Sequence, residues 1–158
     1  MYAATLFLRL ALGTAFLSAV SSRLGLWPKD MGGGSWMGFL EYTAELNPWA
    51  SPSWIPFLGS AATVAEVTLG FLLVIGFAQR LVGTASGILL LIFALSMMNG
   101  TGIKSPFDYS VFTASAAAFV FAAIGDSLWS LDSLLRRRTE NKQGSDSSFR
   151  PAEYRMVP

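Results

Sequence analysis

Long apolar runs dominate the pattern of hydrophobic and polar positions along this chain. Four of them stand out, at residues 3–24, 57–78, 81–98 and 107–131. A bilayer core of about 30 Å needs roughly 20 helical residues, and each run is close to that length or longer. Strict alternation of apolar and polar residues is absent, which favours helices over barrel strands. The pattern therefore predicts an all-α integral membrane protein with a bundle of four transmembrane helices.

The first run has an alternative interpretation as a secretory signal peptide. Such peptides combine a short apolar core with a small-residue cleavage site, which LSAVSS at residues 17–22 resembles. The run is long for a signal core, however, and Arg9 lies inside it rather than before it. We therefore expect the segment to be retained as the first helix.

Basic residues near the helix ends predict the orientation, because cytoplasmic loops are enriched in Lys and Arg. The short second connection contains Arg80, and three arginines at residues 136–138 follow the last run. The other side carries Arg23, Lys29 and Lys104. Both termini are then cytoplasmic, and residues 25–56 form an external loop. Residues 1–138 form one transmembrane domain, and the polar, aperiodic residues 139–158 are expected to be a disordered cytoplasmic tail.

The external loop is rich in tryptophan, whose indole ring prefers the headgroup zone of a bilayer. It holds four of the five tryptophans, Trp27, Trp36, Trp49 and Trp54. Within it, SWMGFLEYTAELN predicts a short amphipathic helix with Ser35 as N-cap and with Glu41 and Glu45 on the polar face. The apolar face would comprise Trp36, Phe39, Leu40 and Thr43. We expect an interfacial helix, acting either as a lid on the bundle or as a binding surface.

Two short motifs refine the predicted helices. SPFD places Ser105 as the N-cap of the fourth helix, with Asp108 returning a capping bond. Gly83 and Gly87 form a GxxxG pair in the third helix, which permits close helix packing. The ordinary role of such a pair is packing within the chain, and a homo-oligomer through Gly83 and Gly87 is the alternative.

Composition narrows the function classes. The chain is 53% hydrophobic and 13% charged, and its net charge of +1 gives no electrostatic case for binding nucleic acid. It has no cysteine and no histidine, which excludes disulfides, thiol relays, structural zinc sites and histidine-ligated haem. We expect no metal site and no covalent cofactor, so a redox role would need a bound cofactor or a partner subunit.

Three ionisable residues fall inside the apolar runs, where charge is costly and usually paired or functional. They are Arg9, Glu66 and Asp126. With a rise of about 1.5 Å per residue, Arg9 and Asp126 lie level, roughly 8–9 Å from the cytoplasmic boundary. We therefore predict that Arg9 pairs with Asp126. Two alternatives remain open: Arg9 reaches toward Glu66, or it extends to the inner headgroups and touches neither acid.

Glu66 lies near the predicted midplane, about twelve residues from the inner end of its helix. An unpaired carboxylate at that depth would be protonated, because desolvation disfavours its charge. A protonated acid can donate a hydrogen bond to a carbonyl, for instance on a quinone, or relay protons. A purely structural hydrogen bond to a neighbour such as Thr14 is the alternative.

A third candidate lies at the predicted outer mouth between helices three and four. Asn99, Lys104 and Asp108 would cluster there, above an apolar pocket lined by Met97 and Met98. This arrangement predicts a substrate mouth, although methionines at such positions more often serve ordinary packing.

Several stretches together resemble the DoxX family of small four-helix membrane proteins. They are FLRLALGTAFL in the first run, AEVTLGFLLVIGFAQRL in the second, and IKSPFDYSVFTASAAAF and SLWSLDSLL in the fourth. Each motif is short and degenerate, and the resemblance depends on their order and spacing over residues 6–135. By this resemblance, Arg9, Glu66 and Arg80 match family positions whose roles the family does not fix.

The resemblance implies a multi-pass protein of the inner (plasma) membrane. Some family members look like the small membrane subunit of thiosulfate:quinone oxidoreductase. We therefore expect the membrane subunit of a quinone-linked oxidoreductase system, which binds quinone or docks a redox partner and is not a self-contained enzyme. The alternatives are a non-catalytic membrane scaffold or assembly factor, and a carrier of protons or small solutes that uses Glu66.

Overall fold

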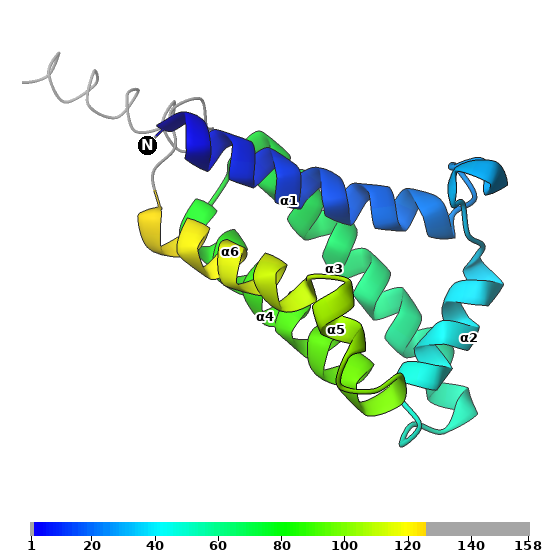
Figure 1. Ribbon diagram of the computed structural model, residues 1–158. Helices are drawn as coiled ribbons and strands as arrows, with labels where there is room; N and C mark the ends of the chain where they lie inside the picture. The colour runs from blue at the N-terminus through cyan, green and yellow to red at the C-terminus, as the bar shows by residue number, and fades with distance from the viewer. Residues whose placement is uncertain (1, 126–158) are drawn as a thin grey trace, which may run out of the picture.

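The computed structural model describes residues 2–125, which fold into helices and their connections with no strand among them. The long helices run along the molecule, and α2 crosses one end of it (Figure 1). The long elements are α1 (Tyr2–Arg23), α3 (Ile55–Ile75), α4 (Gln79–Gly100) and α6 (Val111–Ile124), with α2 at Trp36–Leu46. The short turns are η1 (Lys29–Met31), η2 (Pro52–Trp54) and α5 (Ser105–Asp108). The all-α class expected from the sequence is confirmed.

Three helical segments of the described part are long and apolar enough to cross a membrane. They are Ala3–Arg23, Pro52–Ile75 and Gln79–Gly100. The helix α6 is also apolar but has only 14 residues, which correspond to about 21 Å. The chain is thus a multi-pass membrane protein, with three full-length spans and one shorter apolar helix among residues 2–125.

The fourth helix differs from the uninterrupted span predicted for residues 107–131. The backbone at Ser110 takes a left-handed φ of 55°, which separates the single turn α5 from α6. Gly125, at φ 65°, caps the end of α6. Ser105 lies inside α5 and caps nothing with its side chain, while Asp108 bonds Lys104 instead. Residues 126–131 lie outside the described residues.

The second predicted helix, residues 57–78, was placed too far along the chain at both ends. The helix α3 begins at Ile55 and ends at Ile75, because Gly76 adopts a left-handed φ of 71°. The Gly76 N–H then donates to the Leu72 carbonyl at 2.9 Å, which closes the last turn. Glycine is the residue that most easily adopts this helix-ending conformation.

The four long helices form two antiparallel pairs, α1 with α3 and α4 with α6 (Figure 1). In the first pair Gly13 lies against Gly70, where an added Cβ would come within 3.0 Å of the partner's carbonyl oxygen. In the second pair Gly83 lies against Phe121, and Gly87 lies against the Phe119 ring. The GxxxG pair therefore packs within the chain, which is its ordinary role, and the alternative of a homo-oligomer through Gly83 and Gly87 is not tested.

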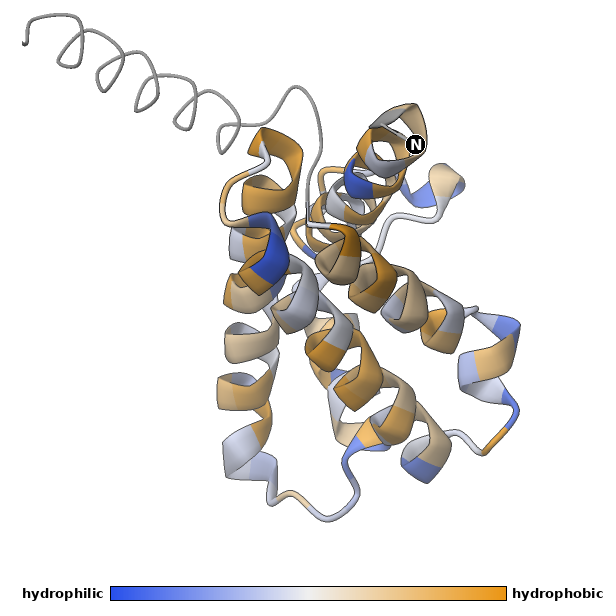
Figure 2. Cartoon of the chain, turned by 90° about the vertical axis from the view of Figure 1, so that its left-hand side faces the viewer, coloured by the Kyte–Doolittle hydropathy of each residue, from blue (hydrophilic) through white to orange (hydrophobic). Residues whose placement is uncertain are grey.

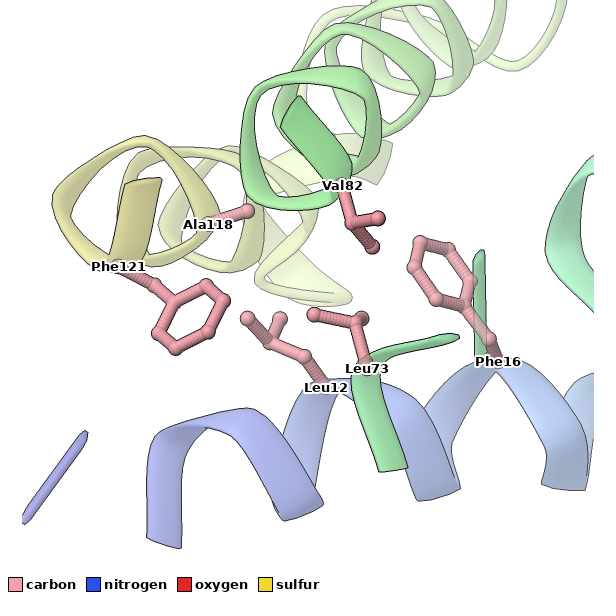
Figure 3. Packing of buried hydrophobic residues seen from close by; sticks show 6 residues of the cluster. All are labelled: Leu12, Phe16, Leu73, Val82, Ala118 and Phe121. Carbon is pink, nitrogen blue, oxygen red and sulfur yellow. The ribbon is translucent and has the colours of Figure 1, made fainter. Parts of the chain in front are cut away.

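The two pairs join through a hydrophobic core at the end of the molecule opposite α2. Side chains from all four long helices point toward one another there (Figure 3). The core comprises Leu12 and Phe16 of α1, Leu73 of α3, Val82 of α4, and Ala118 and Phe121 of α6. This core packs one end of the bundle closely. The end covered by α2 is not part of the core.

The outward faces of the helices are apolar as well. Phe7, Phe71 and Leu81 are each more than half exposed, and the hydropathy colouring is largely orange along the long helices (Figure 2). In water such a surface would be a large aggregation liability. A lipid bilayer around the bundle accounts for it.

Candidate functional site

A cavity of about 1170 Å³ occupies the α2 end of the bundle. The lining comes from the last turns of α1, the first half of α3, the second half of α4 and the inner side of α2. Its apolar wall includes Phe39, Leu46, Leu58, Ala62, Leu89, Phe93 and Met97. Its polar residues include Ser22, Arg23, Lys29, Tyr42, Asn47 and Tyr109. The cavity is thus amphipathic, with cationic and phenolic groups beside an aliphatic and aromatic wall.

The helix that covers this cavity forms as its sequence predicts. The Ser35 side chain accepts a hydrogen bond from the Gly38 N–H at 3.1 Å, which confirms Ser35 as the N-cap of α2. Thr43 is buried and Phe39 is partly buried against the bundle, whereas Glu41 and Glu45 are exposed. The predicted apolar and acidic faces of α2 are therefore confirmed.

A buried ion pair stands at the wall of the cavity. The Arg23 guanidinium of α1 binds both carboxylate oxygens of Glu66 on α3: Nη1 donates to Oε2, and Nη2 donates to Oε1 at 2.9 Å. Nη1 also donates to the Thr63 hydroxyl at 3.3 Å. The side chain of Glu66 is 4% exposed and that of Arg23 is 14% exposed. Bidentate pairs of this kind fix the geometry of both partners as well as their charge.

The Arg23 side chain extends inward from the end of its helix. With Gly13 against Gly70 in an antiparallel pair, Arg23 lies level with about Ser60, and Glu66 lies roughly 9 Å farther into the bundle. An arginine at a helix end usually extends outward to the headgroups. Here the buried carboxylate draws it the other way, so one positive charge is held inside the apolar region.

The ring of Phe39 covers one face of this guanidinium. The Arg23 Cζ atom lies 3.9 Å from the centroid of the Phe39 ring, within the range of a cation–π interaction. Guanidinium has five N–H donors, and among the described residues the hydrogen bonds above use three of them. Because Arg23 lines the cavity, its remaining edge can donate charge-assisted hydrogen bonds to a carbonyl or anionic oxygen placed there.

Two tyrosines add phenolic donors to the same lining. Tyr42 comes from α2 and Tyr109 from the turn between α5 and α6. Burial, followed by the proximity of Tyr109 and Glu45, raises the pKa of the Tyr42 phenol above its usual value. Tyr42 therefore stays neutral at physiological pH and is able to donate a hydrogen bond.

Arg9 lies at the other end of the bundle from this cavity and does not line it. It is 3% exposed, which disagrees with the alternative that its side chain extends to the headgroups. Glu66 is level with about Leu17, roughly 12 Å from Arg9 along the helix axis, and Arg23 binds it instead. Asp126 lies outside the described residues, so the pairing of Arg9 with Asp126 stays a prediction.

Thr14 is not the structural partner of Glu66 that the sequence offered. Its hydroxyl donates to the Leu10 carbonyl of its own helix at 2.7 Å. Glu66 is paired with Arg23, so the unpaired acid for which protonation was expected is not what the structure has.

The three residues predicted at the outer mouth do not line the cavity. Lys104 and Asp108 form an exposed ion pair at 2.6 Å one helical turn apart, and Asn99 is exposed at the end of α4. Of the two methionines, Met97 lines the cavity. The cavity is lined instead by residues of α1, α2, α3 and α4 together with Lys29, Tyr109 and Val111.

Sequence reasoning missed Arg23, which it used only as a marker of orientation. A usable signal was present, because an arginine that ends one apolar helix has a carboxylate, Glu66, within the next. Deciding that the two meet required the register of α1 on α3.

One protein family has a sequence model that matches residues 31–148 of this chain, and that family is described as the TQO small subunit DoxD. The match covers most of the chain, including α2, α3, α4 and α6. No curated protein and no solved structure matches the chain.

Proposed function

The chain belongs to the DoxD family, and from this membership together with the cavity we propose that it is the quinone-binding membrane subunit of a thiosulfate:quinone oxidoreductase-like system. The observation that carries the proposal is the Arg23–Glu66 pair at the wall of an amphipathic cavity within the membrane-spanning bundle. The protein would act with a partner subunit that supplies electrons, because it has no cysteine or histidine of its own.

The residues of the cavity fit a quinone. Ligand pockets of about 300–1,000 Å³ with apolar walls and a few convergent polar groups hold molecules of this size, and this cavity measures about 1170 Å³. Aromatic and aliphatic side chains suit the ring and its tail, while Arg23, Tyr42 and Tyr109 offer donors to carbonyl oxygens. The bound quinone would supply the two-electron chemistry that the side chains lack.

Each residue then has a distinct part. Arg23 donates a hydrogen bond to a quinone carbonyl and stabilises negative charge that develops on that oxygen. Glu66 holds the guanidinium in place through two hydrogen bonds and balances its charge while the cavity is empty. The apolar wall excludes water and so strengthens the interaction between Arg23 and the ligand.

The experiment is a binding titration of decylubiquinone to the purified protein in lipid nanodiscs. We expect Arg23→Gln and Glu66→Gln each to raise Kd about tenfold, the loss of one hydrogen bond to a charged group. Lys104→Gln is the matched control, because Lys104 belongs to an exposed ion pair away from the cavity.

A second measurement follows thiosulfate-dependent quinone reduction in membranes that contain the partner subunit. We expect both cavity variants to lower the rate and the Lys104 variant to leave it unchanged. Unchanged Kd values and rates in folded Arg23 and Glu66 variants would contradict the proposal and favour a scaffold. Movement of protons into liposomes without any partner would instead favour a carrier.

A further inference from the structure

The cavity is covered by a helix that makes few buried contacts of its own. Thr43 is the one residue of α2 that is fully buried, although Gly38, Phe39, Tyr42 and Leu46 of the same helix line the cavity. A short helix that covers a large cavity with so little buried surface has a low local free energy of opening. The contacts that hold it down can be identified one by one.

The C-terminal end of α2 is fixed on α4. Gly100 lies directly beneath the Glu45 carbonyl and the Leu46 backbone, so closely that no side chain would fit there. The Asn47 side chain reinforces this end by donating to the Thr43 carbonyl at 2.9 Å. The close contact between the backbones of Gly100 and of Glu45 and Leu46 makes the C-terminal end the pivot of α2.

The N-terminal half of α2 is held by side chains. Phe39 stacks on Arg23 at 3.9 Å, and Phe39 and Leu40 rest on Gly59 of α3, where an added Cβ would lie 3.2 Å from Phe39 and 2.7 Å from Leu40. The connection that precedes α2 is the glycine run 32–34, in which Gly32 has a left-handed φ of 83°. Hydrogen bonds from the Gly34 N–H to the Ser22 hydroxyl at 2.9 Å and from the Gly33 N–H to the Pro28 carbonyl at 3.0 Å hold this connection, so opening of α2 must break them. Once they break, three successive glycines give the backbone the freedom to rearrange.

We propose that α2 is a hinged lid, which pivots at Gly100, and that the stack of Phe39 on Arg23 is the latch that keeps it closed. Opening lifts the N-terminal half of α2, removes the Phe39 ring from the guanidinium and exposes the Arg23–Glu66 pair to the outside of the bundle. The lid controls access for any occupant of the cavity, so its test does not depend on a quinone.

The test uses a single cysteine placed behind the lid. No other thiol reacts, because the chain has no cysteine of its own. Ala62→Cys puts a thiol on the α3 wall of the cavity, and its rate of reaction with a small water-soluble methanethiosulfonate reagent in nanodiscs reports opening. Ile103→Cys, at a position that is 68% exposed outside the cavity, gives the reference rate.

Phe39→Leu keeps an apolar side chain but removes the aromatic face. Combined with Ala62→Cys, we expect it to raise the labelling rate of the cavity thiol about fivefold, which corresponds to the loss of a cation–π interaction of ~1 kcal/mol. Phe39→Tyr retains the aromatic face and is expected to stay within about twofold of the unaltered lid. The rate of the reference thiol, introduced by Ile103→Cys, should be the same whichever residue occupies position 39.

Gly59→Ala provides an independent route to the open lid. The added methyl group meets Leu40 and Phe39 from below and should displace the lid without changing the latch residues, again raising the rate of the cavity thiol. If that thiol reacts equally fast with and without either substitution, α2 does not gate the cavity. If Phe39→Tyr labels as fast as Phe39→Leu, the stack on Arg23 is not the latch.

Discussion

Arg23 and Glu66 each depend on the other for their place in the apolar part of the bundle. A charge in a bilayer interior is costly unless it is paired, and these two side chains are 14% and 4% exposed. The pair also ties the end of α1 to the middle of α3, beside the cavity. The pair is therefore expected to contribute both to the stability of the bundle and to ligand binding in the cavity. Separate experiments measure the two contributions.

Removal of one partner should cost more stability than removal of both. Arg23→Met or Glu66→Leu leaves a buried charge without its counter-ion, and we expect each to lower the free energy of unfolding by about 3–5 kcal/mol. The double variant replaces the pair with apolar side chains and should lie close to the unaltered protein. Unfolding in detergent, followed by circular dichroism, measures all three. Additive losses in the double variant would show that the pair is not buried as described.

At the scale of helices, glycine determines how closely each pair approaches. The contact of Gly13 with Gly70 sets the register of α1 on α3, and that register in turn decides which side chains can meet. A glycine in contact across a helix pair should therefore respond to substitution very differently from one on an exposed helix face.

Gly70→Ala and Gly38→Ala form a matched comparison. The Cβ at position 70 would lie 3.1 Å from the Gly13 carbonyl oxygen and from two side chains of α1, so we expect a loss of about 1–3 kcal/mol from overpacking. At position 38 the nearest atom is the Ser35 hydroxyl at 3.4 Å, and alanine should stabilise α2 by up to about 1 kcal/mol. Equal thermal unfolding of the two variants would contradict the close approach of α1 and α3.

Much of the fold could be predicted from periodicity and end signals, and the exceptions have physical causes. Apolar length identified α1, α3 and α4, and the Ser35 cap with its amphipathic pattern identified α2. The break before α6 was missed because Ser110, a residue without glycine's freedom, adopts the left-handed conformation. Gly76, in contrast, carried a usable stop signal.

The candidate site was harder to predict than the helices. Glu66 was identified because a carboxylate in an apolar run is rare, but Arg23 was not considered as its partner, because pairing was judged from depth alone. The length of the arginine side chain defeats that argument, since Arg23 reaches across about 9 Å along the helix axis. Which way such a side chain extends depends on the facing helix, and no single segment of sequence contains that information.

At the scale of the whole molecule, the bundle has one packed end and one open end covered by α2. The packed end holds the core of Leu12, Phe16 and Leu73 with their partners on α4 and α6 (Figure 3). The helix α4, with 22 residues, carries the chain over about 33 Å from one end to the other. Its two flanking connections should therefore lie on opposite sides of the membrane.

Single cysteines test the predicted orientation. Phe77 precedes α4 and is 40% exposed, and Ile103 follows α4 and is 68% exposed. If the distribution of basic residues places the α3–α4 connection in the cytoplasm, Ile103→Cys should react with a membrane-impermeant thiol reagent in intact cells, and Phe77→Cys only after permeabilisation. The reverse labelling pattern would place α2 and the cavity that it covers on the cytoplasmic side.

The joining of two glycine-packed helix pairs at one end has a consequence for how the bilayer acts on the protein. Glycine contacts pack each pair closely, and the α1–α3 pair meets the α4–α6 pair through the core near the packed end. Lateral pressure from the surrounding lipids therefore acts with the greatest leverage on the far end, where it pushes the pairs together around the cavity. We expect lipids that pack loosely in the headgroup region to widen the cavity and lipids that pack tightly to narrow it, so that membrane composition itself becomes a control on what the cavity admits.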